Sequence, residues 1–412
     1  MSTPTDYHIF KLDNGLRCVF RRAPHVGYCG IVVNAGSRDD GDEFGLAHFV
    51  EHTIFKGTEK RRSRHIASRM ESVGGDLNAY TTKDETTVYT AFPAGFSPRA
   101  LELLADLASA STFPADELDK ERDVVVDEIN LYLDNPSESI FDEFEDRIFA
   151  GSAPGHNILG TPESVAKIDS RRCLDFRRKF YTADNMTLFC VDDCSPQKAM
   201  ADISRYFGAL PSGERNNSRI QVAETAPFDD IIRQEGHQSH TILGARVSRR
   251  DDPERFALFM LNNHLGGPAM NSLLNRELRD KRGYVYTVDS SINLMEDCGT
   301  MQIYFGCDPC HTAPCIRLTK KILTSLAQSP MKPSVFEKVR RQYLGQLIVS
   351  TDNRESQAIG LAKSLMWFDA IHDAEFTASR VRELTAEDVR AAAERILSAG
   401  LSRLTIDPTN PQ

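Results

Sequence analysis

An internal repeat is the feature that most constrains this chain, because it divides the 412 residues into two comparable parts. Two matches share one offset of 218 residues: segment 118–122 lies over 336–340, and 134–135 lies over 352–353. A third match, at an offset of 212, places residues 47–52 over 259–264. Together the matches favour a duplicated unit, with a short insertion or deletion between the matched blocks.

The most polar and turn-rich stretch of the interior, residues 212–219, lies close to the midpoint. We interpret it as a linker between one domain over 1–211 and a second over 220–412. A strand pair around Asp13-Asn14-Gly15 opens the chain, and strands over 29–35, 86–91 and 300–305 alternate with helical patterns. The sequence therefore predicts an α+β protein of two similar domains, each a mostly antiparallel sheet packed with helices.

The composition excludes several classes of protein. Hydrophobic residues make up 41% and charged residues 26%, as in ordinary globular proteins, and the net charge of −10 gives no general attraction to nucleic acid or to an anionic membrane. No stretch approaches the ~20 consecutive apolar residues of a membrane-spanning helix. Nine scattered cysteines suit free thiols in a reducing compartment. We expect a cytoplasmic protein that binds neither nucleic acid nor membrane.

The sharpest local motif is His48-Phe49-Val50-Glu51-His52. On a helix, His48 and His52 are one turn apart, so both imidazoles can bind one Zn²⁺. Glu51 shares that face and could accept the proton of a water that the ion activates. This is the inverted zinc-peptidase pattern H-x-x-E-H. The alternative is a pair of histidines on a helix surface beside an unrelated glutamate.

A catalytic zinc site needs a third protein ligand. Residues 116–134 have the period of a long helix that carries Glu121 and Glu128, whose separation of seven residues is close to two turns. We interpret Glu128 as the third ligand and Glu121 as a carboxylate that orients a ligand or tunes the water. From the spacing alone, a solvated acidic helix face is the favoured interpretation.

The repeat favours a metal site over a solvated helix face, because the second half keeps only one of the two histidines and three glutamates. His52 corresponds to His264, whereas His48 corresponds to Met260, Glu51 to Asn263, Glu121 to Val339 and Glu128 to Gln346. The joint loss of Glu121 and Glu128 together with His48 and Glu51 indicates that these residues once served one site. We therefore place the metal chemistry in residues 1–211 and expect one Zn²⁺ per chain, although Co²⁺ or Mn²⁺ could occupy the same ligands.

These residues and their surroundings resemble the pitrilysin, insulysin and mitochondrial-processing-peptidase family of zinc metallopeptidases, over nearly the whole chain. The segment 121–129 is similar to the family's third-ligand helix, and Glu128 follows His52 at the family's usual separation, 76 residues. The resemblance implies that Glu128 is the ligand. The segment 73–81 is similar to the family's substrate-binding edge strand, which implies that Asn78 and Ala79 contact an extended peptide added as a further strand.

The segment 278–286 resembles the family's Arg/Tyr element, which implies that Arg279 and Tyr286 reach the substrate, with Arg282 as an alternative guanidinium. An arginine and a phenol aimed at a carbonyl can position it and stabilise an oxyanion. An ordinary exposed helix end is the other interpretation. In the family this element comes from the opposite half of a clamshell, so the resemblance implies a homodimer with two composite sites around a closed chamber.

The sequence thus predicts a zinc metalloendopeptidase that cleaves oligopeptides or unfolded peptide segments, similar to a short bacterial-type member of the family. Residues 1–211 would form the catalytic domain, and 220–412 a metal-less domain that carries the Arg/Tyr element. Two alternatives stay open. The chain could be a non-catalytic assembly subunit of the same fold, or one chain of a hetero-oligomeric peptidase.

Overall fold

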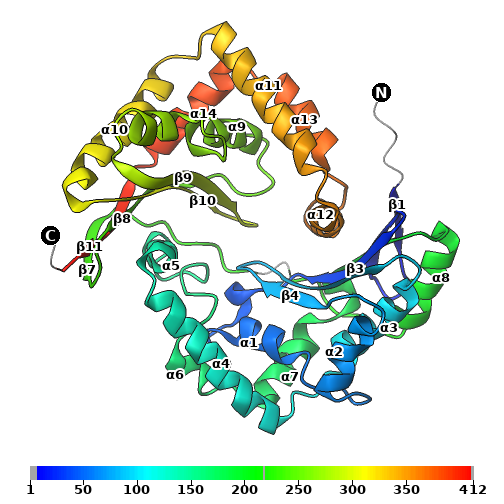
Figure 1. Cartoon of the computed structure of the whole chain (residues 1–412). Coiled ribbons are helices and arrows are strands. Elements are labelled where there is room, and N and C mark those ends of the chain that lie inside the picture. Colours follow the sequence, from blue (N-terminus) through cyan, green and yellow to red (C-terminus); the bar gives the residue numbers. More distant parts are fainter. Residues whose placement is uncertain (1–6, 217–218, 410–412) are drawn as a thin grey trace. The chain divides into compact units, whose positions relative to one another are not determined.

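The computed structural model describes residues 7–216 and 219–409, which form two compact units (Figure 1). The first unit contains the residues up to Asn130 together with His156–Ile220 and Asn353–Asp373. The second contains Leu131–Gly155, Gln221–Asp352 and the residues from Ala374 onward. The units therefore differ from a linear division at 211 and 220, because two internal segments each belong with the other half of the sequence. Within the expected linker 212–219, residues 217 and 218 lie outside the described residues.

The first unit is built on a mixed sheet. Its strands are β1 (Tyr7–Lys11), β2 (Arg17–Arg22), β3 (Val26–Val33), β4 (Asn78–Thr81), β5 (Thr86–Pro93) and β6 (Met186–Asp192). Its longer helices are α1 (Leu46–Thr53), α2 (Ser63–Glu71), α3 (Ser97–Ala110), α4 (Ala115–Leu133), α7 (Ser170–Phe180), α8 (Pro196–Phe207) and α12 (Arg354–Phe368), and α4 ends just inside the second unit. Short helical turns are η1 (Ser37–Asp39), α6 (Pro162–Val165) and η2 (Ala183–Asn185).

The strand order in this sheet is β1-β2-β6-β3-β5-β4, so β4 is an edge strand. β1 and β2 pair antiparallel across the turn that contains Asp13-Asn14-Gly15, as the sequence predicts. Of the described strand pairs in this sheet, β2 and β6 alone run parallel. The interior strand β6 is buried along its whole length, because helices cover both faces of the sheet.

Each face of the first sheet has its own hydrophobic cluster. On one face, side chains such as Cys18 and Ile31 pack with apolar residues of α1, α3 and α7. On the other face, Val32 and Phe189 pack with Ala362 and Met366 of α12. Figure 1 shows α12 on one side of β3 and α1, α2, α3 and α7 on the other. The helices α1 and α12 thus lie on opposite faces of one sheet.

The second unit repeats this architecture. Its strands are β7 (Asp229–Gln234), β8 (Ser239–Val247), β9 (Val285–Leu294), β10 (Gly299–Cys307) and β11 (Ser402–Pro408). Its helices are α5 (Pro136–Ile148), α9 (Arg255–Gly266), the π-helical segment η3 (Asn275–Asp280), α10 (Pro309–Gln328), α11 (Pro333–Ser350), α13 (Ala374–Glu383) and α14 (Ala386–Ser398). The strand order is β7-β11-β8-β10-β9, with β7 and β11 parallel and β9 at an edge.

The two sheets share one topology. β2, β6, β3, β5 and β4 of the first sheet correspond in order to β7, β11, β8, β10 and β9 of the second, and the one parallel pair falls in the same place. In the second unit α9, α10 and α14 cover one face of the sheet, while α5 packs on the other through Ile140 and Phe144. The prediction of two similar α+β domains with mostly antiparallel sheets is confirmed.

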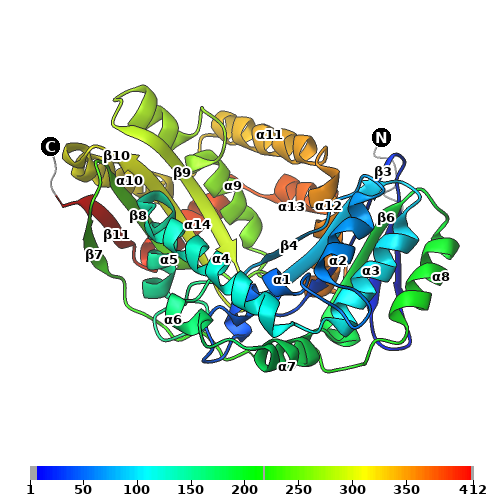
Figure 2. The same ribbon diagram turned by 60° about the horizontal axis from the view of Figure 1, so that its bottom comes forward.

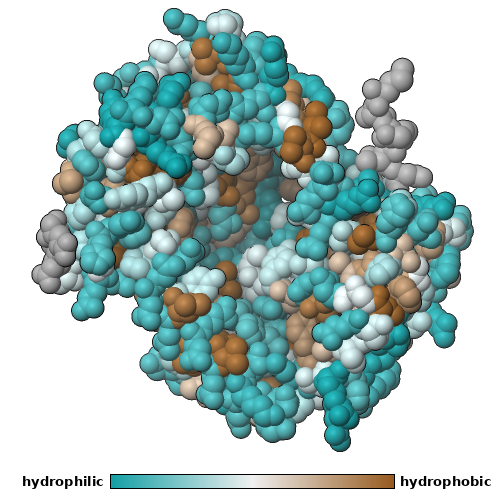
Figure 3. All heavy atoms as spheres, in the orientation of Figure 1, coloured by the Kyte–Doolittle hydropathy of each residue, from teal (hydrophilic) through white to brown (hydrophobic). Residues whose placement is uncertain are grey.

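The surface visible in Figure 3 is largely hydrophilic, with apolar residues in scattered patches. All nine cysteines are free thiols, as their scattered spacing predicts. Within residues 7–216 and 219–409, no helix combines the length and the apolar character needed to cross a membrane.

Candidate metal centre

Helix α1 begins in a way that fixes the position of the H-x-x-E-H motif. The carboxylate of Asp40 accepts hydrogen bonds from the backbone N–H groups of Gly45 and Ala47, both at 2.8 Å, and so satisfies donors that a helix start leaves free. Gly45 has a φ of 91°, and a Cβ there would lie 2.6 Å from the carbonyl oxygen of Leu159. Only glycine fits this start. His156, to which the sequence assigned no role, lies 3.4 Å from Asp40 through Nε2.

The side chains of the motif are held in a largely buried position. His48 and Glu51 are only 6% and 9% exposed. The rings of His48 and His52 lie with their centroids 4.5 Å apart, as expected for residues one turn apart on the same face of α1. The motif therefore lies on a helix, and its two imidazoles are neighbours.

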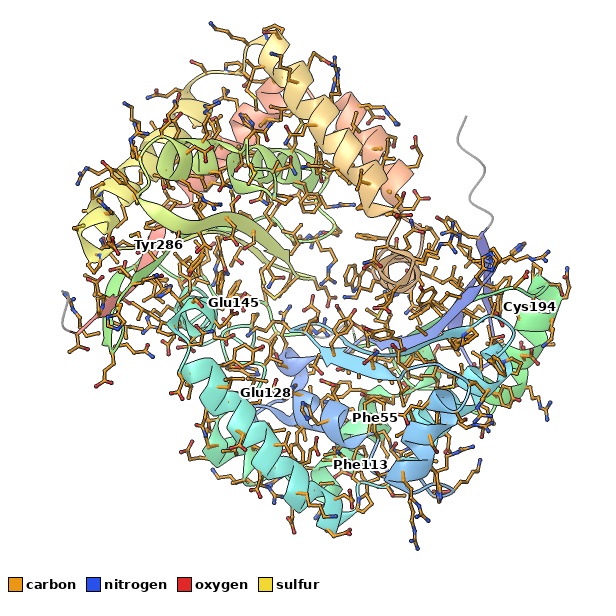
Figure 4. All side chains as sticks on the ribbon, viewed as in Figure 1. Phe55, Phe113, Glu128, Glu145, Cys194 and Tyr286 are labelled. Carbon is orange, nitrogen blue, oxygen red and sulfur yellow. The ribbon has the colours of Figure 1, made fainter. Side chains whose placement is uncertain are left out.

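The two carboxylates predicted for the site, Glu121 and Glu128, lie on helix α4. Its side chain Glu128 projects on the side of the helix that faces α1 (Figure 4), with Oε2 at 3.4 Å from His52 Nε2 and 3.8 Å from His48 Nε2. One ligand atom from each of these three residues lies within 4.8 Å of the others. Across the described parts of the chain, no other trio of His, Cys, Asp or Glu side chains comes together in this way.

These three donors suit a zinc ion. With bonds of ~2.1 Å in tetrahedral geometry, two ligand atoms of one zinc stand ~3.4 Å apart. The separations of 3.4 and 3.8 Å from Glu128 to the two imidazoles are close to that value. Two imidazole nitrogens and one carboxylate oxygen are also a donor set that zinc accepts, with the fourth position left for water or substrate. The residues present therefore fit the metal that the sequence predicts.

Glu121 acts on His52 from the side opposite Glu128. Its Oε1 lies 3.0 Å from His52 Nδ1, and its Oε2 lies 2.6 Å from Nζ of Lys56. An ionised carboxylate can only accept, so Nδ1 of His52 carries the proton and Nε2 is directed towards Glu128. Burial alone would lower the pKa of His52, but the hydrogen bonds with Glu121 and Glu128 raise it to about 9. Glu121 and Glu128 thus stabilise positive charge on the His52 imidazole.

Burial disfavours the charged forms of the other two motif residues. Desolvation lowers the pKa of His48 to about 4, with a further contribution from His52. Desolvation raises the pKa of Glu51 to about 7, although His52 and a hydrogen bond from Thr81 oppose the shift. Thr81 Oγ1 donates to Glu51 Oε2 at 3.3 Å from the end of β4. A carboxyl with a pKa near neutrality is suited to accept and return a proton.

β4 lies next to this cluster. Helix α1 contacts β4, and Figure 2 shows the two side by side. Among the strands that the structure describes, β4 pairs only with β5, so its other edge has backbone groups without a described strand partner. Asn78 is exposed and Ala79 half-buried on this strand. The segment that the sequence associates with peptide binding is therefore an edge strand beside the H-x-x-E-H helix.

The Arg/Tyr element lies in the second unit. Arg279 is exposed at the end of η3, and Tyr286, labelled in Figure 4, is 54% exposed at the start of β9. Tyr286 donates to Asp308 at 3.1 Å, and the Arg279 side chain makes no hydrogen bond or ion pair with the residues that the structure describes. The structure does not bring these two side chains into contact with each other. Arg282 pairs instead with Glu277 at 3.1 Å.

Three further residues of the site were not singled out from the sequence. Thr81 holds Glu51, Lys56 pairs with Glu121, and Tyr181 is a fully buried phenol whose pKa is raised by burial and by the nearby charge of Glu51. Thr81 lies inside the segment 73–81 that the sequence analysis had marked, so a signal existed for it. Lys56 and Tyr181 have no local sequence pattern that distinguishes them from surface and core residues.

Comparison with known protein families agrees with this geometry. Residues 21–162 match the model described as Insulinase (Peptidase family M16), and residues 167–343 match the model described as Peptidase M16 inactive domain. The fold and the H-x-x-E-H helix thus define a two-domain protein of the M16 peptidase class, and the chain belongs to that family. Bacterial zinc proteases that match it along almost their whole length place it among the short bacterial-type members.

Individual relatives extend over almost the whole chain. A protein described as an uncharacterized zinc protease of Mycobacterium tuberculosis is 30% identical over 96% of this chain and 92% of its own length. A Bacillus subtilis protein described as the uncharacterized zinc protease YmxG is 26% identical over 97% of this chain and 98% of its own length. The crystal structure of a peptidase M16 inactive domain from Pseudomonas fluorescens superposes with a TM-score of 0.91, at 22% identity and over 99% of both chains. A protease from Helicobacter pylori gives a TM-score of 0.89 at 19% identity, over 98% of this chain and 100% of that one.

Proposed function

We propose that the chain is a zinc-dependent endopeptidase that hydrolyses oligopeptides or unfolded peptide segments. The observation that carries this proposal is the approach of His48, His52 and Glu128 to one point, with Glu51 on the same helix. Membership of the M16 family and relatives named zinc proteases support it. In this proposal the first unit is catalytic and binds one Zn²⁺, and the second unit holds no metal.

In this proposal the metal and the residues around it have separate roles in the reaction. A bound zinc ion would supply a Lewis acid that polarises the peptide carbonyl and acidifies water. Glu51 accepts the proton of the attacking water and passes it to the leaving amine, while Thr81 holds its second oxygen. Glu121 fixes the ring of His52 through Nδ1. Burial of Glu51 excludes bulk water from the proton transfer.

Substrate binding in this proposal uses main-chain hydrogen bonds. An extended peptide adds to the free edge of β4, along Asn78 and Ala79, so that recognition depends on conformation more than on side chains. Arg279 and Tyr286 of a second copy position the carbonyl and stabilise the oxyanion. Such an arrangement requires a homodimer that encloses the substrate in a chamber.

The deciding experiment compares the wild-type chain with Glu51→Gln, which removes the proton acceptor and keeps the shape. We expect Glu51→Gln to retain its zinc, measured by elemental analysis, and to cleave a quenched fluorescent peptide roughly 10²- to 10⁴-fold more slowly. Glu71→Gln, at the exposed end of α2, is the matched control and should cleave at the wild-type rate. Cleavage by Glu51→Gln at the wild-type rate would refute the assignment.

The same preparation also tests the other roles. A chain that binds zinc, forms only homo-oligomers in light scattering and cleaves no peptide would indicate a non-catalytic assembly subunit or a peptidase that needs a different partner chain. Activity of the purified chain alone excludes both.

A further inference from the structure

His156 opens a loop that lies against the start of helix α1. The chain returns to the first unit at this residue, after α5 and the residues that follow it. Residues 156–160 pack closely on residues 44 and 45. Gly160 has a φ of 73°, and a Cβ there would collide with the carbonyl oxygen of Phe44. Glycine at this position thus allows the loop to hold His156 beside α1.

Three parts of His156 each contact a different neighbour. Its buried Nε2 lies 3.4 Å from Oδ2 of Asp40 and makes no shorter hydrogen bond with the residues that the structure describes. Its ring stacks on Phe44, with the centroids 4.3 Å apart and the planes 13° from parallel. Its carbonyl oxygen accepts a hydrogen bond from Nζ of the buried Lys83 at 2.5 Å. His156 therefore joins the start of α1 to the turn between β4 and β5.

The carboxyl group of Asp40 that His156 contacts is fully buried. Its two oxygens accept the hydrogen bonds from the backbone N–H groups of Gly45 and Ala47. Burial raises the pKa of Asp40 above its usual value, and the hydrogen bond from His156 is the largest of the opposing effects. Without this donor the neutral carboxyl would be favoured, and it would bind the two N–H groups less strongly than the carboxylate does. His156 thus supports the hydrogen bonds that fix the start of α1.

The position of Glu51 depends on both elements that His156 joins. Glu51 lies on α1, and Thr81 at the end of β4 donates to its Oε2 at 3.3 Å. Thr81 comes two residues before Lys83, whose ammonium group is held by the carbonyl oxygen of His156. A general base must lie within hydrogen-bond reach of the proton that it takes, and a displacement of ~1 Å can slow a reaction ~10²-fold. A loosened start of α1 would therefore slow the proton transfer to Glu51.

We propose that His156 is a positioning residue, which acts through Asp40 to keep α1, and with it Glu51, in the geometry that proton transfer requires. The effect on catalysis rests on the proposed peptidase function, whereas the hold on α1 does not. The N–H group at Nε2 carries this role. A residue that only packed the loop against α1 would need the ring but not the N–H group.

The first test is kinetic and uses His156→Phe, which keeps the stacked ring and the backbone carbonyl but removes the N–H group. With zinc content verified by elemental analysis, we expect kcat for a quenched fluorescent peptide to fall at least about tenfold and KM to stay within about twofold, because the β4 edge is unchanged. His156→Gln places an amide N–H near the position of Nε2 and should restore kcat to at least about five times that of His156→Phe. His65→Phe, at an exposed position on α2, is the matched control and should keep wild-type kinetics.

The second test reads the position of α1 without turnover. Amide hydrogen exchange at Gly45 and Ala47 should be faster in His156→Phe than in the wild type and in His156→Gln, while the strands β3 and β6 exchange as before. If His156 acts through Asp40, the double variant His156→Phe/Asp40→Asn should have the same kcat as Asp40→Asn alone. Thermal unfolding verifies that each variant folds, and the exchange measurement decides alone if Asp40→Asn does not.

Several results would overturn the proposal. Wild-type kcat in His156→Phe would remove the catalytic role, and unchanged exchange at Gly45 and Ala47 would remove the hold on α1. If His156→Gln were as impaired as His156→Phe, the ring and not the N–H group would be responsible. A double variant much slower than Asp40→Asn would show that His156 acts by another route. If the wild-type chain cleaves no peptide, the proposed function fails, and hydrogen exchange still tests the role of His156.

Discussion

The two glutamates of α4 show how neighbouring residues of one type acquire different roles from their contacts. Glu128 is directed at both imidazoles, whereas Glu121 reaches only the far nitrogen of His52 and is also paired with Lys56. Hydrogen bonds from His52 dominate the lowering of the pKa of Glu128, and in Glu121 those from His52 and Lys56 outweigh the opposing effect of burial. Both carboxylates are therefore ionised at neutral pH, but only Glu128 can be a third ligand.

The first prediction concerns Glu128. Glu128→Gln replaces a charged donor with a neutral amide, so we expect zinc binding, measured by competition with a chelating dye, to weaken far more than in any other α4 variant. Asp127→Asn, one residue away on the same helix, is the control and should bind zinc as the wild type does. Unchanged affinity in Glu128→Gln would remove this residue from the ligand set.

Glu121→Gln should act more weakly. The variant keeps a hydrogen-bond acceptor for His52 but loses the negative charge, and outer carboxylates of this kind typically change metal affinity about 10- to 100-fold. The same dye competition measures the effect, with Lys56→Met as a companion that removes the partner of Glu121. If Glu121→Gln lost as much zinc affinity as Glu128→Gln, the assignment of Glu128 as the ligand and Glu121 as the outer carboxylate would be contradicted.

At the scale of single residues, the sequence predicts those site residues whose helical spacing places them on one face of a helix. The spacing of His48, His52, Glu121 and Glu128 is helical and places each pair on one face, which is how the structure has them. Lys56 and Tyr181 escape such reasoning, because their proximity to the site depends on how α1 packs with α4 and with α7. That packing is a tertiary property that no local spacing encodes.

At the scale of elements, two corresponding helices have exchanged units. α5 begins at Pro136 and α12 at Arg354, an offset of 218 residues that equals the offset of the repeat. Yet α5 belongs to the second unit and α12 to the first, where each covers one face of the sheet. The repeat predicts which elements correspond, but not on which sheet each one packs. For this reason a linear boundary near residue 211 describes the units only in part.

Because α12 packs on the first sheet, a destabilising substitution in α12 should affect the strands of the first unit. Met366 is fully buried against the first sheet, so Met366→Ala should cost roughly 2–5 kcal/mol and speed amide hydrogen exchange in β3 and β6. The matched control is Ile396→Ala on α14, which should act on the second sheet instead. Faster exchange confined to β8 and β10 in Met366→Ala would contradict the exchange of helices.

At the scale of the whole molecule, the sequence predicts two similar α+β domains because of the repeat, and the structure adds that their sheets share one strand order. The relation between the metal centre and the Arg/Tyr element is different, since the residues lie in separate units and their meeting is inferred from a family resemblance. A homodimer in which Arg279 and Tyr286 of one copy complete the metal site of the other makes a quantitative prediction for mixed assemblies.

Chains that carry Glu51→Gln are inactive in this proposal, and chains that carry Arg279→Gln together with Tyr286→Phe are severely impaired. In a mixed dimer the two defects can fall in the same site, which leaves the other site intact. With random pairing, about half of the dimers are mixed and each has one working site of two, so co-expressed chains should recover about a quarter of the wild-type activity. Peptide cleavage by the co-expressed mixture measures this, and the doubly tagged mixed dimer purified from it should show about half of the wild-type activity. Activity no greater than that of the separate variants would show that each chain completes its own site, or that the Arg/Tyr element does not reach the substrate.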